Sequence, residues 1–422
     1  MDQVLTPPRP LDQLSLPGVL SVAAPGSSLL PPAVSLPPVR RLPSDDERLR
    51  VLVVAESFLP QVNGVTNSVR RVLEHLAAHG HRAELVAPTG PERYAGFPVR
   101  RARGANLPFY PDFRVGLETR RRLRQVITRF RPDVVHIASP ATLGYQAARA
   151  AAELGVPTVA IYQTDLVGFA ERYDLPGGVR AAARLTRRIH TQVDRTLAPS
   201  TASIEQLRDL GVPEVHRWGR GVDLEAFHPR HRDAELRRRL APDGRLLVGY
   251  VGRLAPEKEL HLLEHLADDP RLRLVVVGGG PEEDRLRALL GDRADLLGLL
   301  HGDDLSAAYA SLDVFVHTGR YETFCQSAQE ALASGVPVVA PGAGGPVDVV
   351  DHERNGLLYA PGDGAALAAA VGRLVDDVAL RRRFAADAVS AVQTRSWAAI
   401  NDQLLGHYRA VAAARGGVDR VA

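Results

Sequence analysis

Short apolar runs alternate with amphipathic segments along most of this sequence, and the alternation occurs in two successive series. Each run is rich in Val, Ile and Leu, which suits a strand that is buried on both faces. The segments between the runs carry apolar residues at helical spacing, for example before Gly80 at Val69, Val72, Leu73 and Leu76. Strands that alternate with helices indicate right-handed βαβ units in a parallel sheet, so the expected fold class is α/β.

The two series predict two separate parallel sheets. The first series predicts strands at residues 51–54, 82–87, 134–137, 157–162 and 196–198. The second predicts strands at residues 246–251, 272–277, 295–297, 314–317, 336–340 and 356–359. Between them, residues 212–245 contain Gly, Pro and a charged stretch, which predicts a linker. We therefore expect two Rossmann-like, doubly wound domains that face each other across a cleft, with the ligand in that cleft.

The composition changes toward both ends of the chain. Residues 1–48 hold ten of the 31 prolines and no sustained period, which predicts a disordered Pro-rich extension. The first Rossmann-like domain is expected at residues 49–225 and the second at 226–395. Residues 396–422 form a helical segment that we expect to pack back on the first domain, with Trp397 and Tyr408 as anchors.

Several classes of protein are excluded by composition. The single cysteine, Cys325, rules out an internal disulfide framework and a thiolate-built zinc site, and fits a reducing compartment. No uncharged apolar run approaches about 18 residues, so no membrane span is expected. Asp2 and Asp12 replace the basic start of a secretory signal, and prolines interrupt the apolar stretches. These features predict a cytoplasmic protein.

Almost all the basic residues of this chain are of one type, arginine. Of 52 basic residues 51 are arginine, and the one lysine is Lys258. It stands in the loop Gly252 to Lys258, directly after an expected strand, so its charge and that of Arg253 emerge at the carboxyl end of the sheet. A guanidinium and an ammonium at this spacing can clamp a diphosphate. The alternative is an ordinary loop with two solvated cations.

Two carboxylates, Glu322 and Glu330, follow the expected strand at residues 314–317. We expect Glu322 in a loop and a helix that begins near Phe324 and contains Glu330. The N–H groups and dipole of that helix would favour a phosphate. A helix with exposed glutamates is the alternative, but the apolar neighbours of Glu330 argue against it.

Other candidate positions give weaker signals. Gly278 to Gly280 follow a strand and could approach a phosphate or base, although a simple tight turn explains them equally well. Asn63-Gly64 forms another anion-friendly turn. Asp165 could accept a hydrogen bond from a substrate hydroxyl or could cap a helix. His136 lies within an apolar strand and is interpreted as a core residue.

The order of these motifs resembles the retaining glycosyltransferases of family 4, which have the GT-B fold. The resemblance rests on Asn63-Gly64-Val65, on Gly252-Arg253 with Lys258, and on Glu322-x7-Glu330 running into Ala331 to Val339. It covers nearly everything from Val51 to the C-terminus. The segments from Ala55 to Ser68, Tyr162 to Asp165 and His317 to Phe324 further resemble actinobacterial GDP-mannose-dependent α-mannosyltransferases that act on glycolipids, with sulfolipid synthases as cousins.

The resemblance implies a role for each matching residue. Arg253 and Lys258 would neutralise the departing diphosphate, and Glu322 would bind hydroxyls of the donor sugar. Glu330 would bind the nucleotide ribose. Asp165 and Gln163 would approach the sugar, and Gln163 stands where many relatives have histidine, so no base is available there. The nucleotide would contact backbone or side chains of these residues: Asn63, Gly64, Gly252, Gly278, Gly280, Phe324, Cys325 and Gln326.

The resemblance also implies the reaction and its participants. A nucleotide-diphosphate sugar, GDP-mannose in particular, would donate a hexose to a lipid-linked or other glycoside acceptor with retention. The leaving diphosphate would take the acceptor proton, so neither a metal nor a further cofactor is expected. The alternatives are a UDP-sugar donor and a non-catalytic protein that binds a sugar nucleotide.

The arginine-rich segment from Leu117 to Arg131 is a possible contact with the membrane. Its arginines interleave with apolar residues, so it could rest on anionic headgroups at the inner face of the plasma membrane. Equally, it could be a solvated helix whose apolar stripe packs on the sheet. Phe130 is the one aromatic residue of this segment, which gives no series of rings on which bases could stack, so nucleic-acid binding is not expected.

Overall fold

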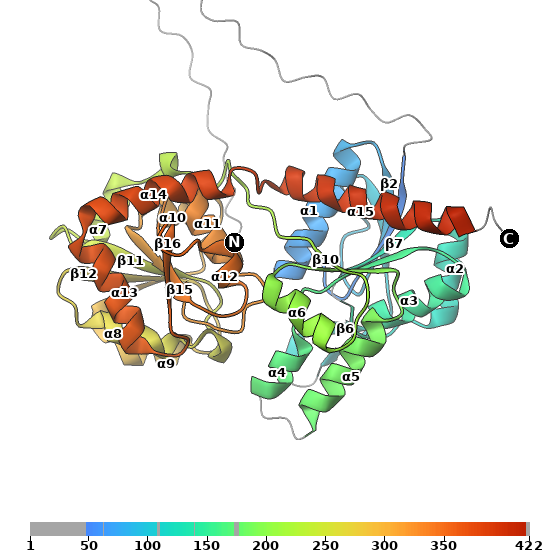
Figure 1. Ribbon diagram of the computed structural model, residues 1–422, viewed down its shortest axis with the longest axis horizontal. Coiled ribbons are helices and arrows are strands. Elements are labelled where there is room, and N and C mark those ends of the chain that lie inside the picture. The colour runs from blue at the N-terminus through green and yellow to red at the C-terminus, as the bar shows by residue number, and fades with distance from the viewer. Residues whose placement is uncertain (1–47, 62, 108–109, 139, 173–176, 419–422) are drawn as a thin grey trace, which may run out of the picture. The chain divides into compact units, whose positions relative to one another are not determined.

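The computed structural model describes residues 48–418 except 62, 108–109, 139 and 173–176 (Figure 1). The expected Pro-rich extension falls on residues 1–47 and lies outside the described residues. Among the described residues, no helix combines the length and the apolar character needed to cross a membrane.

The first sheet has eight strands in the order β10-β9-β8-β7-β1-β2-β4-β3, and all its neighbours are parallel except β3 and β4. A separate antiparallel pair, β5 and β6, lies outside it. The strands are β1 Arg50–Ala55, β2 Arg82–Ala87, β3 Arg93–Tyr94, β4 Phe97–Arg101, β5 Gly104–Leu107, β6 Tyr110–Gly116, β7 Val134–Ala138, β8 Thr158–Ile161, β9 Arg195–Ala198 and β10 Val215–Arg217. The helices are α1 Gly64–Ala78, α2 Arg120–Phe130, α3 Thr142–Glu153, α4 Leu166–Arg172, α5 Gly178–His190 and α6 Thr201–Asp209.

The second sheet has six parallel strands in the order β13-β12-β11-β14-β15-β16. Its strands are β11 Leu246–Val251, β12 Leu272–Val277, β13 Ala294–Gly298, β14 Val314–Val316, β15 Val338–Pro341 and β16 Gly356–Tyr359. The helices of this half are α7 Ala234–Leu240, α8 Glu264–Ala267, α9 Glu283–Leu290, α10 Gly302–Ser311, α11 Gln326–Ala333, α12 Pro346–Val349, α13 Gly364–Asp376, α14 Val378–Val392 and α15 Trp397–Val418. Short 3-10 turns lie at Pro229–His231, Pro256–Lys258, Leu260–Leu263 and Gly291–Arg293.

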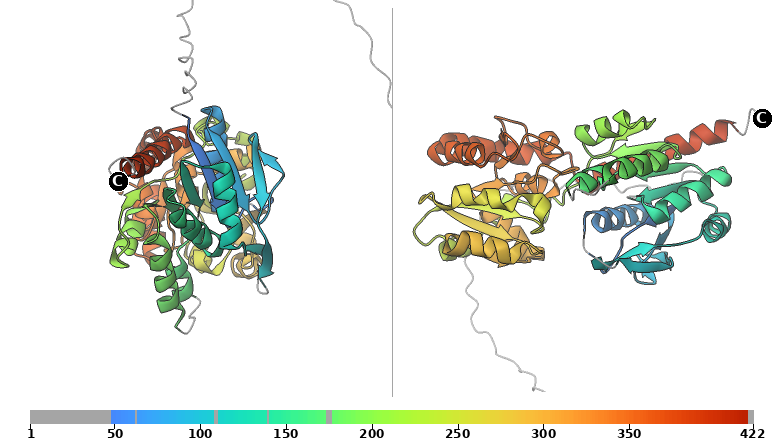
Figure 2. Two further views of the ribbon diagram at one scale, coloured as in Figure 1. Left: turned by 90° about the vertical axis from the view of Figure 1, so that its right-hand side faces the viewer. Right: turned by 90° about the horizontal axis from the view of Figure 1, so that it is seen from below.

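Both sheets are covered by helices on their two faces (Figure 2). Alternate residues of a strand point to opposite faces. Accordingly, Val51 and Val53 of β1 pack in one apolar cluster with α1, whereas Leu52 and Val54 pack in another with α2 and α3. In the second sheet, too, alternate residues of each strand pack in two different apolar clusters, one on each face. The expectation of two doubly wound α/β domains is confirmed, while the boundaries at residues 48, 225 and 395 stay predictions.

Helix α15 packs on the first sheet although it follows the second in sequence (Figure 1). Tyr408 is fully buried, and its hydroxyl lies 2.6 Å from Nδ1 of His136. Trp218 donates from Nε1 to the carbonyl oxygen of Ile400 at 2.9 Å. His136 is thus a partnered core residue, as expected, and Trp397 is buried as well.

The structure refines two local features. The interval 212–245, which was expected to hold a linker, also contains β10, which extends the first sheet, and α7. In the arginine-rich segment α2 begins at Arg120, because the side chain of Thr119 caps it by accepting from the N–H of Arg122 at 3.3 Å.

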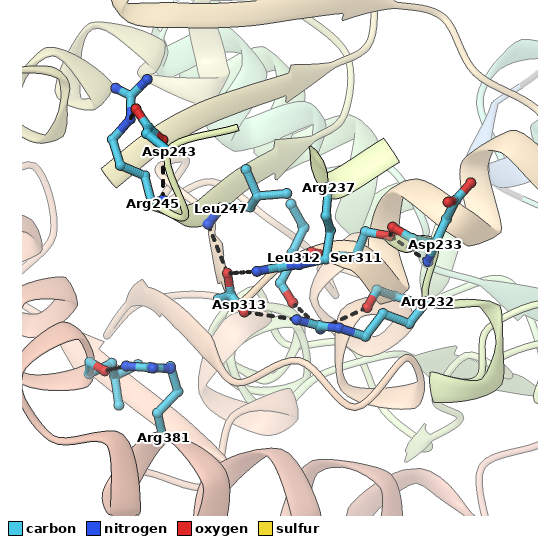
Figure 3. A network of polar contacts seen from close by, with 12 residues as sticks. Arg232, Asp233, Arg237, Asp243, Arg245, Leu247, Ser311, Leu312, Asp313 and Arg381 are labelled. Atoms are coloured by element: carbon cyan, nitrogen blue, oxygen red, sulfur yellow. Dashed lines mark hydrogen bonds and ion pairs between the residues drawn. The ribbon is translucent and has the colours of Figure 1, made fainter. Parts of the chain in front are cut away.

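A polar network attaches α7 to the second sheet (Figure 3). The carboxylate of Asp313 accepts hydrogen bonds from Arg237 at 2.9 Å, from Arg232 at 3.1 Å and from the N–H of Leu247 at 2.9 Å. Asp313 precedes β14 and Leu247 lies in β11, so the network fixes the start of both strands. The side chain of Asp313 is 11% exposed, so its charge depends on these partners.

Candidate active site

The predicted cation and carboxylate meet at the carboxyl edge of the second sheet. Neighbouring strands β11 and β14 end at Val251 and Val316, and the strand order reverses direction around them. This is the switch point where open α/β sheets bind ligands. Here Nζ of Lys258 pairs with Oε1 of Glu322, and Nε2 of His317 lies 3.2 Å from the same oxygen.

The three charges of this cluster depend on one another because His317 is buried and the side chains of Lys258 and Glu322 are only 19% and 17% exposed. Burial alone would raise the pKa of Glu322, but Lys258 and His317 hold it well below its usual range. Burial alone would lower the pKa of Lys258, but Glu322 raises it above its usual value. The pKa of His317 is lowered by burial but raised by Cys325 and Glu322, with a net value of about 9. Two cations therefore surround one carboxylate at neutral pH, which leaves positive charge for an anionic ligand.

Glu330 lies in α11, as expected, and has polar partners of a different kind. The hydroxyl of Tyr309 donates to its Oε2 at 3.0 Å, and Nε2 of Gln326 lies 3.3 Å from its Oε1. Burial raises the pKa of Glu330 to about 7, against the opposing effect of these hydrogen bonds and of Arg220. This carboxyl can therefore change its charge near neutral pH.

The start of α11 lies beside this cluster. The helix begins at Gln326, two residues after the expected start, because Cys325 adopts a left-handed conformation with φ of 76°. The side chain of its N-cap residue, Cys325, makes no capping hydrogen bond to the first N–H groups of the helix. Uncapped N–H groups and the helix dipole favour an anion at this end.

A cavity of about 520 Å³ joins these groups. Nine of the residues predicted from the sequence line it: Asn63, Gly64, Gly252, Arg253, Lys258, Glu322, Cys325, Gln326 and Glu330. The volume falls within the range of small-molecule sites. These nine residues thus share one cavity, and their assignment to a binding or catalytic role stays a prediction.

Arg253, which the sequence assigned to a diphosphate, pairs with a carboxylate of its own loop. Its guanidinium pairs with Glu257, and 56% of its side chain is exposed. Lys258, in contrast, is 19% exposed. Arg253 would have to leave Glu257, or share it, to reach a ligand in the cavity.

The turn at Asn63 is fixed by its side chain. Oδ1 of Asn63 accepts from the N–H of Thr66 at 2.9 Å and so caps α1, while Nδ2 donates to Ser57 at 2.7 Å. A Cβ at Gly64 would lie 3.1 Å from the guanidinium of Arg220, which donates to the Gly64 carbonyl oxygen. Glycine at this position lets the arginine approach the start of α1.

Two predicted glycines lie behind the cavity and do not line it. A Cβ at Gly278, whose φ is 142°, would lie 1.9 Å from the carbonyl oxygen of Gly252. A Cβ at Gly280, whose φ is 153°, would lie 2.3 Å from the carbonyl oxygen of Leu254. These glycines allow the loop after β12 to pack on the loop after β11. Phe324 also does not line the cavity and is buried in the core beneath α11.

Asp165 has the capping geometry that the sequence left open. Its Oδ1 accepts from the N–H groups of Val167 and Gly168 at 3.1 and 2.9 Å, at the start of α4. The same oxygen accepts from the hydroxyl of Tyr162 at 3.0 Å. Gln163 is different, because neither polar atom of its buried amide has a hydrogen-bond partner within the described part of the chain. Gln163 does not line the 520 Å³ cavity but a separate pocket of about 10 Å³.

Among the cavity residues that sequence reasoning missed, three lie beside the charged groups. His317 and Tyr309 line the cavity, and the fully buried ring of Tyr250 stacks on His317 with centroids 6.1 Å apart. His317 directly follows β14, so the strand-end argument that selected Lys258 could have selected it too. Tyr309 gives no such signal, because it lies on α10 within an apolar pattern.

Comparisons with known proteins identify the family of this chain. Residues 62–226 match the family model Glycosyltransferase Family 4, and residues 231–390 match Glycosyl transferases group 1. A GDP-mannose-dependent alpha-mannosyltransferase of Mycobacterium tuberculosis is 51% identical over 86% of this chain and 97% of its own length. A GDP-mannose-dependent alpha-mannosyltransferase of Corynebacterium glutamicum is 43% identical over 86% of this chain and 90% of its own length.

Solved structures share the fold at lower identity. Sucrose-phosphate synthase from Thermosynechococcus elongatus has a TM-score of 0.71 at 22% identity, over 87% of this chain and 100% of that one. Anabaena HepE, solved with UDP, has a TM-score of 0.69 at 21% identity. The match covers 86% of this chain and 100% of that one. The family models and the relatives together show that this chain belongs to glycosyltransferase family 4 and is a glycosyltransferase with the GT-B fold.

Proposed function

We propose that the protein transfers mannose from GDP-mannose to a hydroxyl of a glycolipid or other glycoside acceptor, with retention of the anomeric configuration. The donor and sugar are supported by the names of relatives that are 43–51% identical over most of their length. The observation that carries the proposal is the buried cluster of Lys258, Glu322 and His317 beside the uncapped start of α11.

Lys258 stabilises the charge that develops on the leaving diphosphate. Its ammonium is already ordered by Glu322 before the donor arrives, so little reorganisation is needed in the reaction. Arg253 and the first N–H groups of α11 supply further donors for the same charge. The bond from the anomeric carbon to the diphosphate breaks, and a bond to the acceptor oxygen forms on the same face. The acceptor proton passes to the departing diphosphate oxygen, so no protein base and no metal is required.

Glu322 is better suited to bind sugar hydroxyls than to attack the sugar. Lys258 and His317 surround one of its oxygens, and an ion-paired carboxylate is a weak nucleophile. The side chain at position 163 is an amide, which supplies hydrogen bonds but neither a base nor a nucleophile. These two features favour a leaving-group-driven reaction over a double displacement.

A thermal-shift panel tests the donor. We expect GDP-mannose to stabilise the protein more than UDP-glucose, UDP-galactose or ADP-glucose at equal concentration. A ligand at about 100 times its Kd adds about 2.7 kcal/mol to the free energy of unfolding. A larger shift with a UDP-sugar would assign the alternative donor, whereas stabilisation without sugar transfer to any glycolipid extract would indicate a non-catalytic protein.

Donor binding is expected to weaken at acidic pH because of Glu330. An ionised carboxylate accepts hydrogen bonds from ribose hydroxyls, and its pKa of about 7 means that it is mostly protonated at pH 6 and mostly ionised at pH 8. The Kd for GDP-mannose should therefore fall about tenfold from pH 6 to pH 8. GDP-mannose is the suitable probe because it has no terminal phosphate that titrates in this range. In Glu330→Gln binding should be weaker and should not vary with pH; an unchanged pH profile in that variant would contradict the assignment.

We also propose that the arginine face of α2 contacts anionic lipid. The apolar stripe of this helix, which includes Leu123 and Ile127, is buried against the first sheet, so only its polar face is available. Glu153 pairs with Arg120 at 2.9 Å and Arg124 at 3.4 Å, which reduces but does not cancel the positive charge. Leu117, just before the helix, is 54% exposed.

Vesicle co-sedimentation tests this contact. We expect binding to vesicles that contain phosphatidylglycerol at low salt and release at high salt, because screening weakens electrostatic adsorption. Arg121→Glu with Arg124→Glu should lower the bound fraction by at least about tenfold, since each basic residue near the surface contributes about 1 kcal/mol. Arg382→Glu with Arg383→Glu, on exposed positions of α14, is the matched control. Indifference of the wild type to anionic lipid would refute the proposal.

A further inference from the structure

Two histidines and an aspartate converge between α1 and α15, away from the residues that line the 520 Å³ cavity. His75 lies in the last turn of α1 and His79, four residues later, is the C-cap residue of the same helix, so the two side chains lie on the same side of it. Their Nε2 atoms lie 3.1 and 3.8 Å from Oδ1 of Asp402 on α15. One ligand atom from each residue lies within 4.8 Å of the other two.

The two distances from the histidine Nε2 atoms to Asp402 Oδ1 are close to the distance between two ligand atoms of one tetrahedral metal ion. Zinc binds histidine nitrogen and carboxylate oxygen at about 2.0–2.1 Å, so two tetrahedral ligands are about 3.4 Å apart. The two measured separations lie on either side of this value. A rotation of the His79 ring that moved Nε2 by a few tenths of an ångström would bring the longer separation to this value.

The ligands are already oriented by contacts with the backbone. Nδ1 of His79 lies 2.8 Å from the carbonyl oxygen of His75, which can only accept, so Nδ1 carries the proton and Nε2 keeps its lone pair. A hydrogen bond of this kind on the distal nitrogen is the usual second contact of a metal-binding histidine. Next to Asp402, buried Asn401 donates from Nδ2 to the carbonyl oxygen of Arg71 at 3.1 Å, which fixes the register of α15 on α1.

We propose that His75, His79 and Asp402 bind one divalent transition-metal ion, with Zn²⁺ the ion that best suits this ligand set. The side chains of His75, His79 and Asp402 are 7%, 20% and 47% exposed, so the open side of the site faces solvent past Asp402. A water molecule or another solvent ligand fills the fourth position. The ion links the C-terminal helix to the first domain, and this role is independent of the sugar-transfer site.

Calorimetric titration of the full, tag-free chain with ZnCl₂ tests the site. One equivalent should bind to the wild type, and this binding should be lost in His79→Ala and in Asp402→Asn. The matched control is His261→Ala, an exposed histidine elsewhere, which should bind as the wild type does. Co²⁺ should give the visible absorption of a nitrogen and oxygen site in the wild type and the control alone.

A second measurement keeps the test valid if a variant is less stable. Circular dichroism without metal establishes that each variant is folded, and hydrogen exchange should show slower exchange in α15 when Zn²⁺ is added to the wild type. Failure of Zn²⁺ to bind, or equal binding by wild type and both variants, would overturn the proposal and would leave a simple His–Asp ion pair. Sugar transfer is measured separately, so its failure would bear only on the proposed function.

Discussion

Replacement of Lys258 by alanine is expected to lower kcat by about 10² to 10³, equivalent to about 3 to 4 kcal/mol of transition-state stabilisation. The reason is that Lys258 is a largely buried cation that lines the cavity, and Glu322 already holds its ammonium in place. Steady-state kinetics with saturating donor would measure the loss.

Arg253→Ala should also lower kcat, although the guanidinium of Arg253 is more exposed than the ammonium of Lys258 and is paired with Glu257.

Two further variants separate the charge of Lys258 from its support of Glu322. Lys258→Arg keeps the positive charge but not the compact ammonium, so it should recover only part of the activity. The double variant Lys258→Ala with Glu322→Gln removes the unpaired buried carboxylate. If this double variant recovered the activity that Lys258→Ala lost, the lysine would serve only to neutralise Glu322, and its assignment to the diphosphate would be wrong.

Gly345→Ala is expected to reduce kcat/KM by about 10²-fold and the free energy of unfolding by about 1–3 kcal/mol. Gly345 precedes α12 and donates its N–H to the carbonyl oxygen of Glu322 at 2.7 Å. A Cβ at this position would lie 2.3 to 2.4 Å from three backbone atoms of Phe324. Ordinary contact would require the backbone there to move by roughly 1 Å. That movement would displace both Glu322 and the start of α11.

The same turn supplies a control for this prediction. At Gly342 the nearest atom to an added Cβ is the carbonyl oxygen of Tyr359, at 3.4 Å, and no clash results. Gly342→Ala should therefore keep near-wild-type kinetics and melting temperature. Comparable losses in the two variants would mean that the turn, rather than its contact with Phe324, is sensitive to substitution.

Much of the fold and part of the site could be predicted from the sequence because both follow from the ends of parallel strands. Lys258 and Glu322 stand after β11 and β14, and the paired register of these strands brings the two loops together. The strand-end rule needs only strand positions, which the apolar runs supply. It could not show that Glu257 would pair with Arg253, since that contact depends on rotamers.

The missed features depend on contacts that periodicity does not encode. Strand β10 and helix α7 are short and lie among Gly and Pro, so their apolar pattern is weak. The spacing of His75 and His79 is visible in the sequence, but Asp402 meets them only because α15 packs on α1. Asp165 could be read as a cap or as a ligand from sequence alone, and its contacts with the start of α4 needed coordinates.

The placement of α15 affects the order in which the protein can fold during synthesis. Ile400, Leu404 and Tyr408 share an apolar cluster with Val51 and Val53 of the first strand. Helix α1 covers part of this face early in synthesis, but the rest can be covered only after the second domain and α15 have been made. A fragment that ended before Trp397 would expose that remaining part to solvent, which makes it prone to aggregation.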